Sequence, residues 1–191
     1  ITDSDELCWA IDTPLGWPEP FCRLLRGEEA HLNVDQKADS NPYLFRQTEL
    51  WLFSKGFRPL SAVRDLIGSQ SCKGIHFLRR SGLQLSSPGV WGTGQVRAIE
   101  AYPTPARTSP RLQAKFLEVS QNHSYRKKCE AGTNVEKDVR DALWCALIAA
   151  LFTLDYSALV PPISSARADE GWIWIPTDSD SSSADEENCT E

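Results

Sequence analysis

The stretch from Asn134 to Leu154 most constrains how this chain folds, because it is the longest uninterrupted run with a helical period. Asp138 and Asp141 are three residues apart and therefore share one face of that helix. The rest of this side consists of small residues: Ala142, Cys145, Ala146, Ala149 and Ala150. A small-residue face lets a helix lie close against a sheet, with both carboxylates directed at the end of the sheet. Alternatively, the two acids only favour the positive N-terminus of the helix.

The composition is that of a globular protein with one ordinary domain. The chain has 191 residues, of which 41% are hydrophobic and 24% charged. Much of the formal charge of −6 lies in residues 177–191, which have no apolar face and are expected to form a disordered acidic tail. We therefore predict one folded domain over residues 1–176. The strong basic excess of a nucleic-acid coat protein is missing, but a nucleic-acid enzyme needs only a local patch.

Cysteine usage and hydropathy indicate a cytoplasmic protein with no membrane contact. The six cysteines form no Cys-x-x-Cys pair, which argues against a zinc site, and several lie in apolar surroundings typical of buried free thiols. The apolar run 142–154 is too short to cross a bilayer, and no signal peptide is visible. Because the chain contains no methionine, we expect that an N-terminal segment is missing or has been removed.

Two apolar segments predict buried strands that each carry an acid. Leu7–Ile11 is a continuous apolar run, typical of a strand buried on both faces, and Asp12 follows it directly. Ligands of open α/β sheets gather beyond the carboxyl ends of strands, although Asp12 could instead only cap the turn before Pro14. Val96–Tyr102 predicts a second strand, in which Glu100 shares a face with apolar residues and needs a partner or a task.

The remaining segments are predicted from their breakers and periodicity. We expect helices over Tyr43–Lys55, Pro59–Ile67 and Thr108–Val119, a break at Ser69–Lys73, a glycine-rich loop at Ser86–Gln95 and an edge strand at Gly171–Pro176. Arg46 lies in the first turn of its helix, where a cation opposes the helix dipole. It is therefore expected to pair with a carboxylate or a phosphate. The basic segment Gln121–Gly132 could contact a phosphate backbone or simply be solvated.

Four segments in order resemble one known family. Residues 10–18 (AIDTPLGWP) resemble its strand followed by Asp and Pro-Leu-Gly, and residues 99–103 (IEAYP) its Glu-x-Tyr-Pro strand. Residues 138–143 (DVRDAL) resemble its Asp-x-x-Asp-Ala helix, and residues 170–176 (EGWIWIP) its closing strand. The family is that of the predicted nucleases of domain of unknown function 429, which have an RNase H-like fold. The helix motif is also similar to that of bacterial Holliday-junction resolvases.

The resemblance implies an α/β fold with an RNase H-like mixed sheet flanked by helices and lacking the N-terminal strands. Such proteins begin with a hairpin whose first strand carries the leading catalytic aspartate, and this sequence starts after that point. The implied activity is hydrolysis of nucleic-acid phosphodiester bonds with Mg²⁺ or Mn²⁺, which hard oxygen ligands must hold. Asp12, Asp138 and Asp141 are the implied catalytic metal ligands, and Glu100 is a fourth catalytic candidate. Arg46 would bind a substrate phosphate or pair with Glu100.

Two other functions compete with this prediction. A catalytically inactive binding or scaffold protein of the same fold is favoured by the absent first acid and by the negative charge. A thiol hydrolase would use Cys8 and His76, but Cys8 lies within a predicted strand rather than at a helix N-terminus, where a thiolate would be stabilised. The sequence does not distinguish DNA from RNA as the substrate, and it leaves the oligomeric state open.

Overall fold

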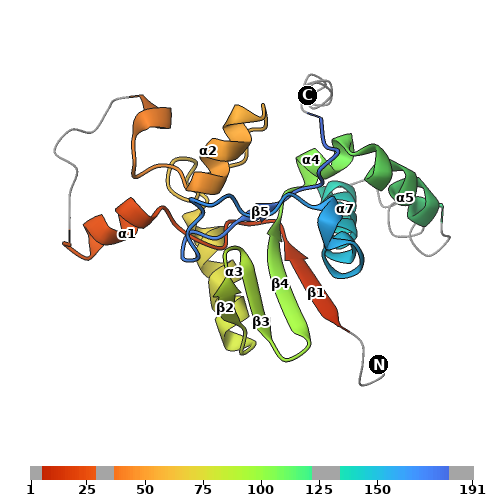
Figure 1. The fold of residues 1–191 in the computed structure, drawn as a ribbon, viewed down its shortest axis with the longest axis horizontal. Coiled ribbons are helices and arrows are strands. Elements are labelled where there is room, and N and C mark those ends of the chain that lie inside the picture. The colour runs from red at the N-terminus through yellow and green to blue at the C-terminus, as the bar shows by residue number, and fades with distance from the viewer. Residues whose placement is uncertain (1–5, 29–36, 122–133, 181–191) are drawn as a thin grey trace.

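The computed structural model describes residues 6–28, 37–121 and 134–180 and has a mixed sheet at its centre (Figure 1). The strands are β1 (Leu7–Ile11), β2 (Gln84–Ser87), β3 (Val90–Thr93), β4 (Val96–Ala101) and β5 (Ile173–Trp174). The sheet runs in the order β1-β4-β3-β2, and β5 pairs with the last two residues of β4. β1 and β5 are parallel to β4, whereas β2, β3 and β4 form an antiparallel meander. The predicted α/β class with a mixed open sheet is therefore confirmed.

Helices flank this sheet. They are α1 (Glu19–Leu25), α2 (Gln47–Ser54), α3 (Gly68–Arg80), α4 (Pro103–Thr108), α5 (Pro110–Ser120) and α7 (Asn134–Leu154), with short 3₁₀ turns η1 (Ala38–Ser40) and η2 (Tyr156–Ala158). The longest helix, α7, has the bounds that the sequence predicts. No described helix is both long and apolar enough to span a membrane.

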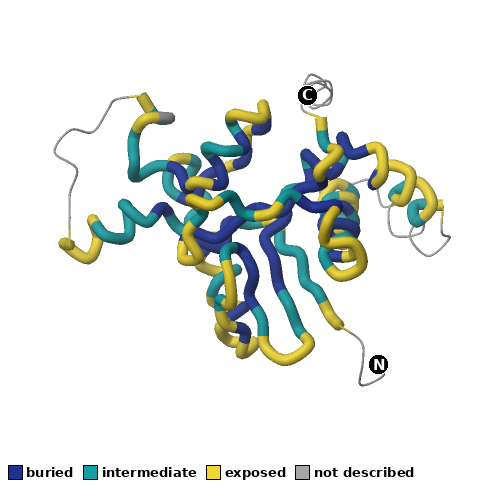
Figure 2. The backbone as a smooth tube through the Cα atoms, in the orientation of Figure 1, coloured by how far each residue is buried: buried dark blue, intermediate teal, exposed yellow. Residues whose placement is uncertain are grey.

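β1 and β4 carry apolar side chains on both faces of the sheet. β4 is largely buried, whereas the residues of β1 are exposed or half-buried because β1 lies at the end of the sheet, so the prediction of a fully buried strand over Leu7–Ile11 is wrong (Figure 2). Cys8 and Ala10 pack with Ile99 in the core that α7 covers. The alternate residues Trp9 and Ile11 belong to the core on the opposite face, which α3 covers. This packing on both sides explains why β1 is continuously apolar in sequence.

The segment before α3 differs from the prediction. Residues 59–67 form turns instead of a helix, and α3 begins at Gly68 and runs through the predicted break. The hydroxyl of Ser61 accepts hydrogen bonds from the backbone N–H groups of Val63 and Arg64, at 3.1 and 3.3 Å. The Ser61 N–H in turn donates to Asp65 at 2.8 Å. Ser61 therefore caps a single turn as a helix N-cap does. Leu66, whose φ is 60°, has left-handed backbone and ends this turn before a helix can extend.

The glycine-rich segment Ser86–Gln95 is also more regular than predicted, because it contains most of a hairpin formed by β2 and β3. Gly89, in the turn between them, has a φ of 70°. A Cβ at this position would lie 2.5 Å from the Cβ of Trp172, so a larger residue would displace the segment that leads into β5.

The chain continues to make contacts beyond the predicted domain end at residue 176. The backbone N–H of Thr177 donates to the carbonyl of Ala158 at 2.9 Å, and Ser109 donates its hydroxyl hydrogen to Asp178 at 2.6 Å. Residues 177–180 therefore lie against α4 and α5, whereas the prediction places them in the acidic tail. The rest of that tail, residues 181–191, lies outside the described residues, as does most of the basic segment 121–132.

Candidate functional site

A cleft of about 270 Å³ opens at the carboxyl ends of β1 and β4. Asp12 and Thr13, which follow β1, form one wall, and Glu100 and Tyr102 at the end of β4 form another. Apolar residues and one amide complete the lining: Pro14, Pro59, Leu60, Ile67, Gln70, Ala101 and Ile173. The cleft lies where parallel strands end, which is where ligands bind in open α/β sheets.

Asp12, at the end of β1, interacts electrostatically with Asp141 of α7. Burial of the side chain, together with the nearby carboxylates of Asp141 and Glu100, raises the pKa of Asp12 to about 6, against the opposing effect of Arg107. Asp12 retains exposed surface because it opens into the cleft, although protein atoms surround much of the side chain. Asp141 forms an ion pair with Arg107 from α4. The edge therefore holds two coupled carboxylates and one cation.

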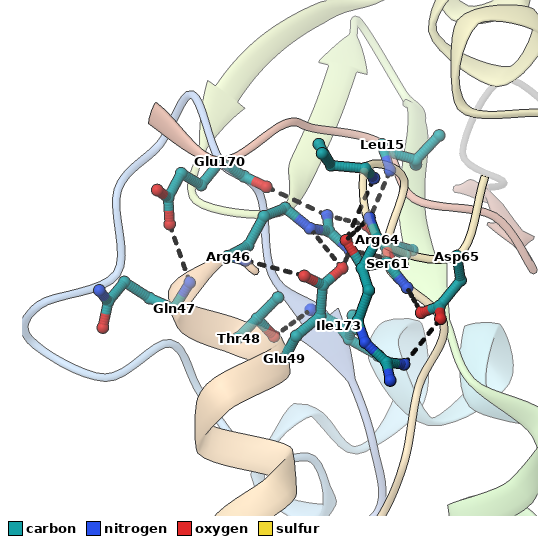
Figure 3. A network of polar contacts seen from close by, with 12 residues as sticks. Leu15, Arg46, Gln47, Thr48, Glu49, Ser61, Arg64, Asp65, Glu170 and Ile173 are labelled. Carbon is teal, nitrogen blue, oxygen red and sulfur yellow. Dashed lines mark hydrogen bonds and ion pairs between the residues drawn. The ribbon is translucent and has the colours of Figure 1, made fainter. Parts of the chain in front are cut away.

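Glu100 and Arg46 form the centre of a buried ion network (Figure 3). The guanidinium donates to both carboxylate oxygens of Glu100, at 2.7 and 2.8 Å, and to Glu49 at 2.8 and 2.9 Å. Arg46 and Glu49 are 0% exposed and Glu100 is 3% exposed. Burial by itself would lower the pKa of Arg46, but the carboxylates of Glu100 and Glu49 outweigh it and raise the pKa.

The same network fixes the loop that follows Asp12. The backbone N–H of Leu15 donates to Oε2 of Glu100 at 2.8 Å. A Cβ on Gly16 would lie only 2.2 Å from the carbonyl oxygen of Glu170, and that oxygen accepts a hydrogen bond from Arg46 at 3.1 Å. The loop is thus held between β4 and the segment before β5, so Glu100 and Arg46 hold in place the loop that begins at Asp12.

The carboxylate of Glu170 links two more backbone segments to this network. It accepts a hydrogen bond from the N–H of Glu19 at 2.8 Å. It accepts another from the N–H of Gln47 at 2.9 Å, which Figure 3 shows. Glu19 and Gln47 are the first residues of α1 and α2, so a carboxylate near both N-termini is electrostatically favourable.

The five residues singled out in the sequence therefore have different positions. Asp12 and Asp141 interact electrostatically, since the Asp141 charge contributes to the raised pKa of Asp12. Asp138 is on the exposed surface of α7, and the charges that shift the pKa of Asp12 are those of other residues. Glu100 faces the cleft but has both oxygens engaged by protein donors. Arg46 was expected to pair with a carboxylate or a phosphate. It pairs with the carboxylate of Glu100 and has no exposed surface left with which to bind a phosphate.

The sequence reasoning missed Arg107 and Glu170. Arg107 lies in the short helix that follows Tyr102-Pro103, and its only sequence signal is a cation shortly after a predicted strand end. Glu170 is 3% exposed, and its signal is an acid directly before the apolar run of β5. Both contacts span large sequence separations, which local patterns do not report.

A divalent cation at this edge would have few protein ligands. Within the described residues, no group of three or more His, Cys, Asp or Glu side chains is placed to hold a metal ion. Mg²⁺ commonly uses only one or two protein carboxylates and completes its shell with water and substrate phosphates. Asp12 and Asp141 supply that minimal set. Glu100 does not extend it, because its oxygens already accept three hydrogen bonds.

The arrangement needed for a thiol hydrolase is not formed. Cys8 is on the α7 side of the sheet, where it hydrogen-bonds with Thr153, and burial raises the pKa of its thiol to about 11. His76 belongs to α3, which covers the opposite face through residues such as Ile75. The sheet therefore separates the two groups, and the thiol stays protonated at neutral pH.

The chain was also compared with models of protein families, with curated proteins and with solved structures, and none of them matches. The resemblance to RNase H-like nucleases therefore stays a prediction based on four sequence segments. The candidate site consists of Asp12 at the cleft, Asp141 with its ion-pair partner Arg107, and the buried network that supports the Asp12 loop.

Proposed function

We propose that this chain is a metal-dependent nuclease domain of the RNase H-like type that hydrolyses phosphodiester bonds in nucleic acid. The observation that carries the proposal is the electrostatic coupling of Asp12, at the end of β1, to Asp141 on α7. Asp12 lines the cleft, and the charge of Asp141 acts on Asp12 although the two acids are distant in sequence. This is the arrangement that the sequence resemblance implies for metal ligands.

Asp12 and Asp141 would hold one Mg²⁺ or Mn²⁺ ion. When bound, such an ion supplies an activated water and neutralises charge on the phosphate. Arg107 orients Asp141 through their ion pair and lowers the pKa of Asp12, so it helps to keep the acid ionised near neutral pH. Glu100 holds the loop that begins at Asp12 through the Leu15 N–H.

The experiment compares three asparagine variants in cleavage of labelled single- and double-stranded DNA and RNA, with Mg²⁺, with Mn²⁺ and with EDTA. Asp12→Asn and Asp141→Asn should abolish metal-dependent cleavage, because each removes half of the carboxylate pair. Asp138→Asn is the matched control, since it changes an exposed acid on the same helix and should retain activity. Cleavage that is unaffected by Asp141→Asn would refute the assignment.

A binding or scaffold protein without turnover is the second candidate. The observation that favours it is that Asp141 is already neutralised by Arg107 and that the oxygens of Glu100 are already engaged. Isothermal titration calorimetry with Mg²⁺ and Mn²⁺ separates the two functions. Heat of binding that disappears in Asp12→Asn supports the nuclease, whereas nucleic-acid binding without any metal binding supports the scaffold.

A further inference from the structure

The outer edge of β1 is a strand edge without a partner among the described residues. β4 pairs with one side of β1 in regular register, from Leu7 opposite Val96 to Ile11 opposite Glu100, and no described strand pairs with the other side (Figure 1). Proteins usually protect such edges with lysine, proline or a bulge. The five residues of β1 contain neither residue, and their register with β4 contains no bulge. The edge is thus open to pairing with another strand.

A groove follows this edge along its length. α7 runs antiparallel to β1, since Cys8 contacts Thr153 near the helix end while Asp12 is coupled to Asp141 near its start. Ala142, Ala146 and Ala150 are exposed and form one stripe on α7. Together with β1 residues they line a groove of about 420 Å³. Small side chains allow a neighbouring backbone to approach closely, so the stripe leaves space for an added strand.

The opposite face of the same edge is also apolar, and the two ends of the groove are acidic. Phe77 of α3 is 50% exposed, and its ring lies 5.4 Å from the ring of Trp9 on β1. A strand added here would meet apolar surface on both faces. Glu6 lines the groove at the start of β1. Beyond the other end, Asp12 directly follows β1 and Asp141 directly precedes Ala142 of the groove, and Arg107 offsets one of these two charges.

We propose that the free edge of β1 binds an extended peptide segment of another protein by adding a strand to the sheet. The segment is apolar over five residues, the length of β1, and carries basic residues on both sides. Its backbone pairs with β1, its alternate side chains pack on the alanine stripe of α7 and on Phe77, and its cations lie near Glu6 and Asp12. Pairing of this kind gives affinity through backbone hydrogen bonds and specificity through alternate side chains.

The test uses a fluorescently labelled synthetic peptide, Lys-Lys-Val-Ile-Val-Ile-Val-Lys-Lys, and measures binding by fluorescence anisotropy. Two further peptides carry N-methyl groups on one or the other alternate set of backbone amides. Only one set faces β1, so we expect one methylated peptide to lose affinity by at least about tenfold while the other binds like the parent. Failure of the parent peptide to bind, or equal binding by all three, would overturn the proposal.

Two protein variants place the peptide on this groove. Ala146→Arg fills the stripe with a long cation and should abolish binding, whereas Leu117→Arg makes a similar change at an exposed position of α5 and should not affect it. Circular dichroism confirms that both variants are folded. Hydrogen exchange is also measured on the free chain, where slow exchange of the β1 amides that do not pair with β4 would mean that the edge is already covered. A dimer in analytical sedimentation would mean that a second copy of the chain occupies the edge. Either result would overturn the proposal, and neither depends on nuclease activity.

Discussion

Replacing Arg46 with methionine tests whether the buried ion network holds the candidate site together. The guanidinium is 0% exposed and donates to Glu100, Glu49 and the carbonyl of Glu170. Methionine retains much of the apolar stem but removes every donor. Two carboxylates then remain buried without the cation that compensates them.

The expected loss follows from the cost of a buried charge without a partner. Removal of one member of a buried ion pair destabilises a protein by about 3–5 kcal/mol. For a domain of this size, such a loss lowers the midpoint of thermal unfolding by on the order of 10 °C. The double variant Arg46→Met/Glu100→Gln removes one of the two orphaned charges, so it should recover part of the stability that the single variant loses.

Urea unfolding followed by circular dichroism at pH 8 and pH 5 provides the measurement. Since protonation removes the orphaned charges, the folded variant takes up protons as the pH falls, and its deficit relative to the unaltered chain should shrink at pH 5. A loss below about 1 kcal/mol, or a deficit that is equal at both pH values, would refute the reasoning, because either result means that the network does not carry the energy assigned to it.

Three further predictions concern the acidic edge and the cysteines. The pKa of Asp12 is raised to about 6 in the folded chain, so the folded chain holds the proton of this side chain more tightly than the unfolded chain does. The stability that this proton contributes is full below about pH 4 and is lost as the pH rises through 6. Asp12→Asn cannot lose a proton, so its stability relative to the unaltered chain should increase between pH 4 and pH 7 in urea titrations. Arg107→Ala should raise the pKa of Asp12 further and remove the cation that orients Asp141, so Mg²⁺ binding at pH 6 to 7 should weaken in calorimetry; unchanged binding would contradict the role assigned to Arg107. At pH 7.5 iodoacetamide should label the exposed Cys72 and leave Cys8 unmodified in peptide mapping, since the pKa of the Cys8 thiol is raised to about 11.

Elements with strong local patterns could be predicted from the sequence. The period of Asn134–Leu154 is helical over its whole length, and α7 has these bounds. The apolar run of β1 is continuous because apolar residues on both faces of this strand pack against the sheet's two cores. Asp12 lines the cleft at the carboxyl end of β1, which is where the rule for open α/β sheets places ligands.

Features that depend on distant partners could not be predicted in this way. Residues 59–67 stop after one turn, since Leu66 has a φ of 60° and the Ser61 hydroxyl donates to the carbonyl of Leu44, 17 residues away, although the local composition is compatible with a helix. Glu100 was expected to have a partner or a task, and only the fold shows that its partner is Arg46, which is 54 residues away. The ion pair of Arg107 with Asp141 spans 34 residues and likewise has no local signature.

The network around Arg46 also has a consequence for the time at which the site appears during protein synthesis. It joins Leu15 to Glu100 and Arg46 to Glu170, across sequence separations of 85 and 124 residues. Contacts between residues this far apart in sequence form late in folding, because the chain must first close a large loop before such a contact can stabilise the fold. A nascent chain that has not yet emerged from the ribosome as far as residue 170 cannot fix the Asp12 loop. The acidic edge is therefore assembled only after nearly all of the described chain has been translated.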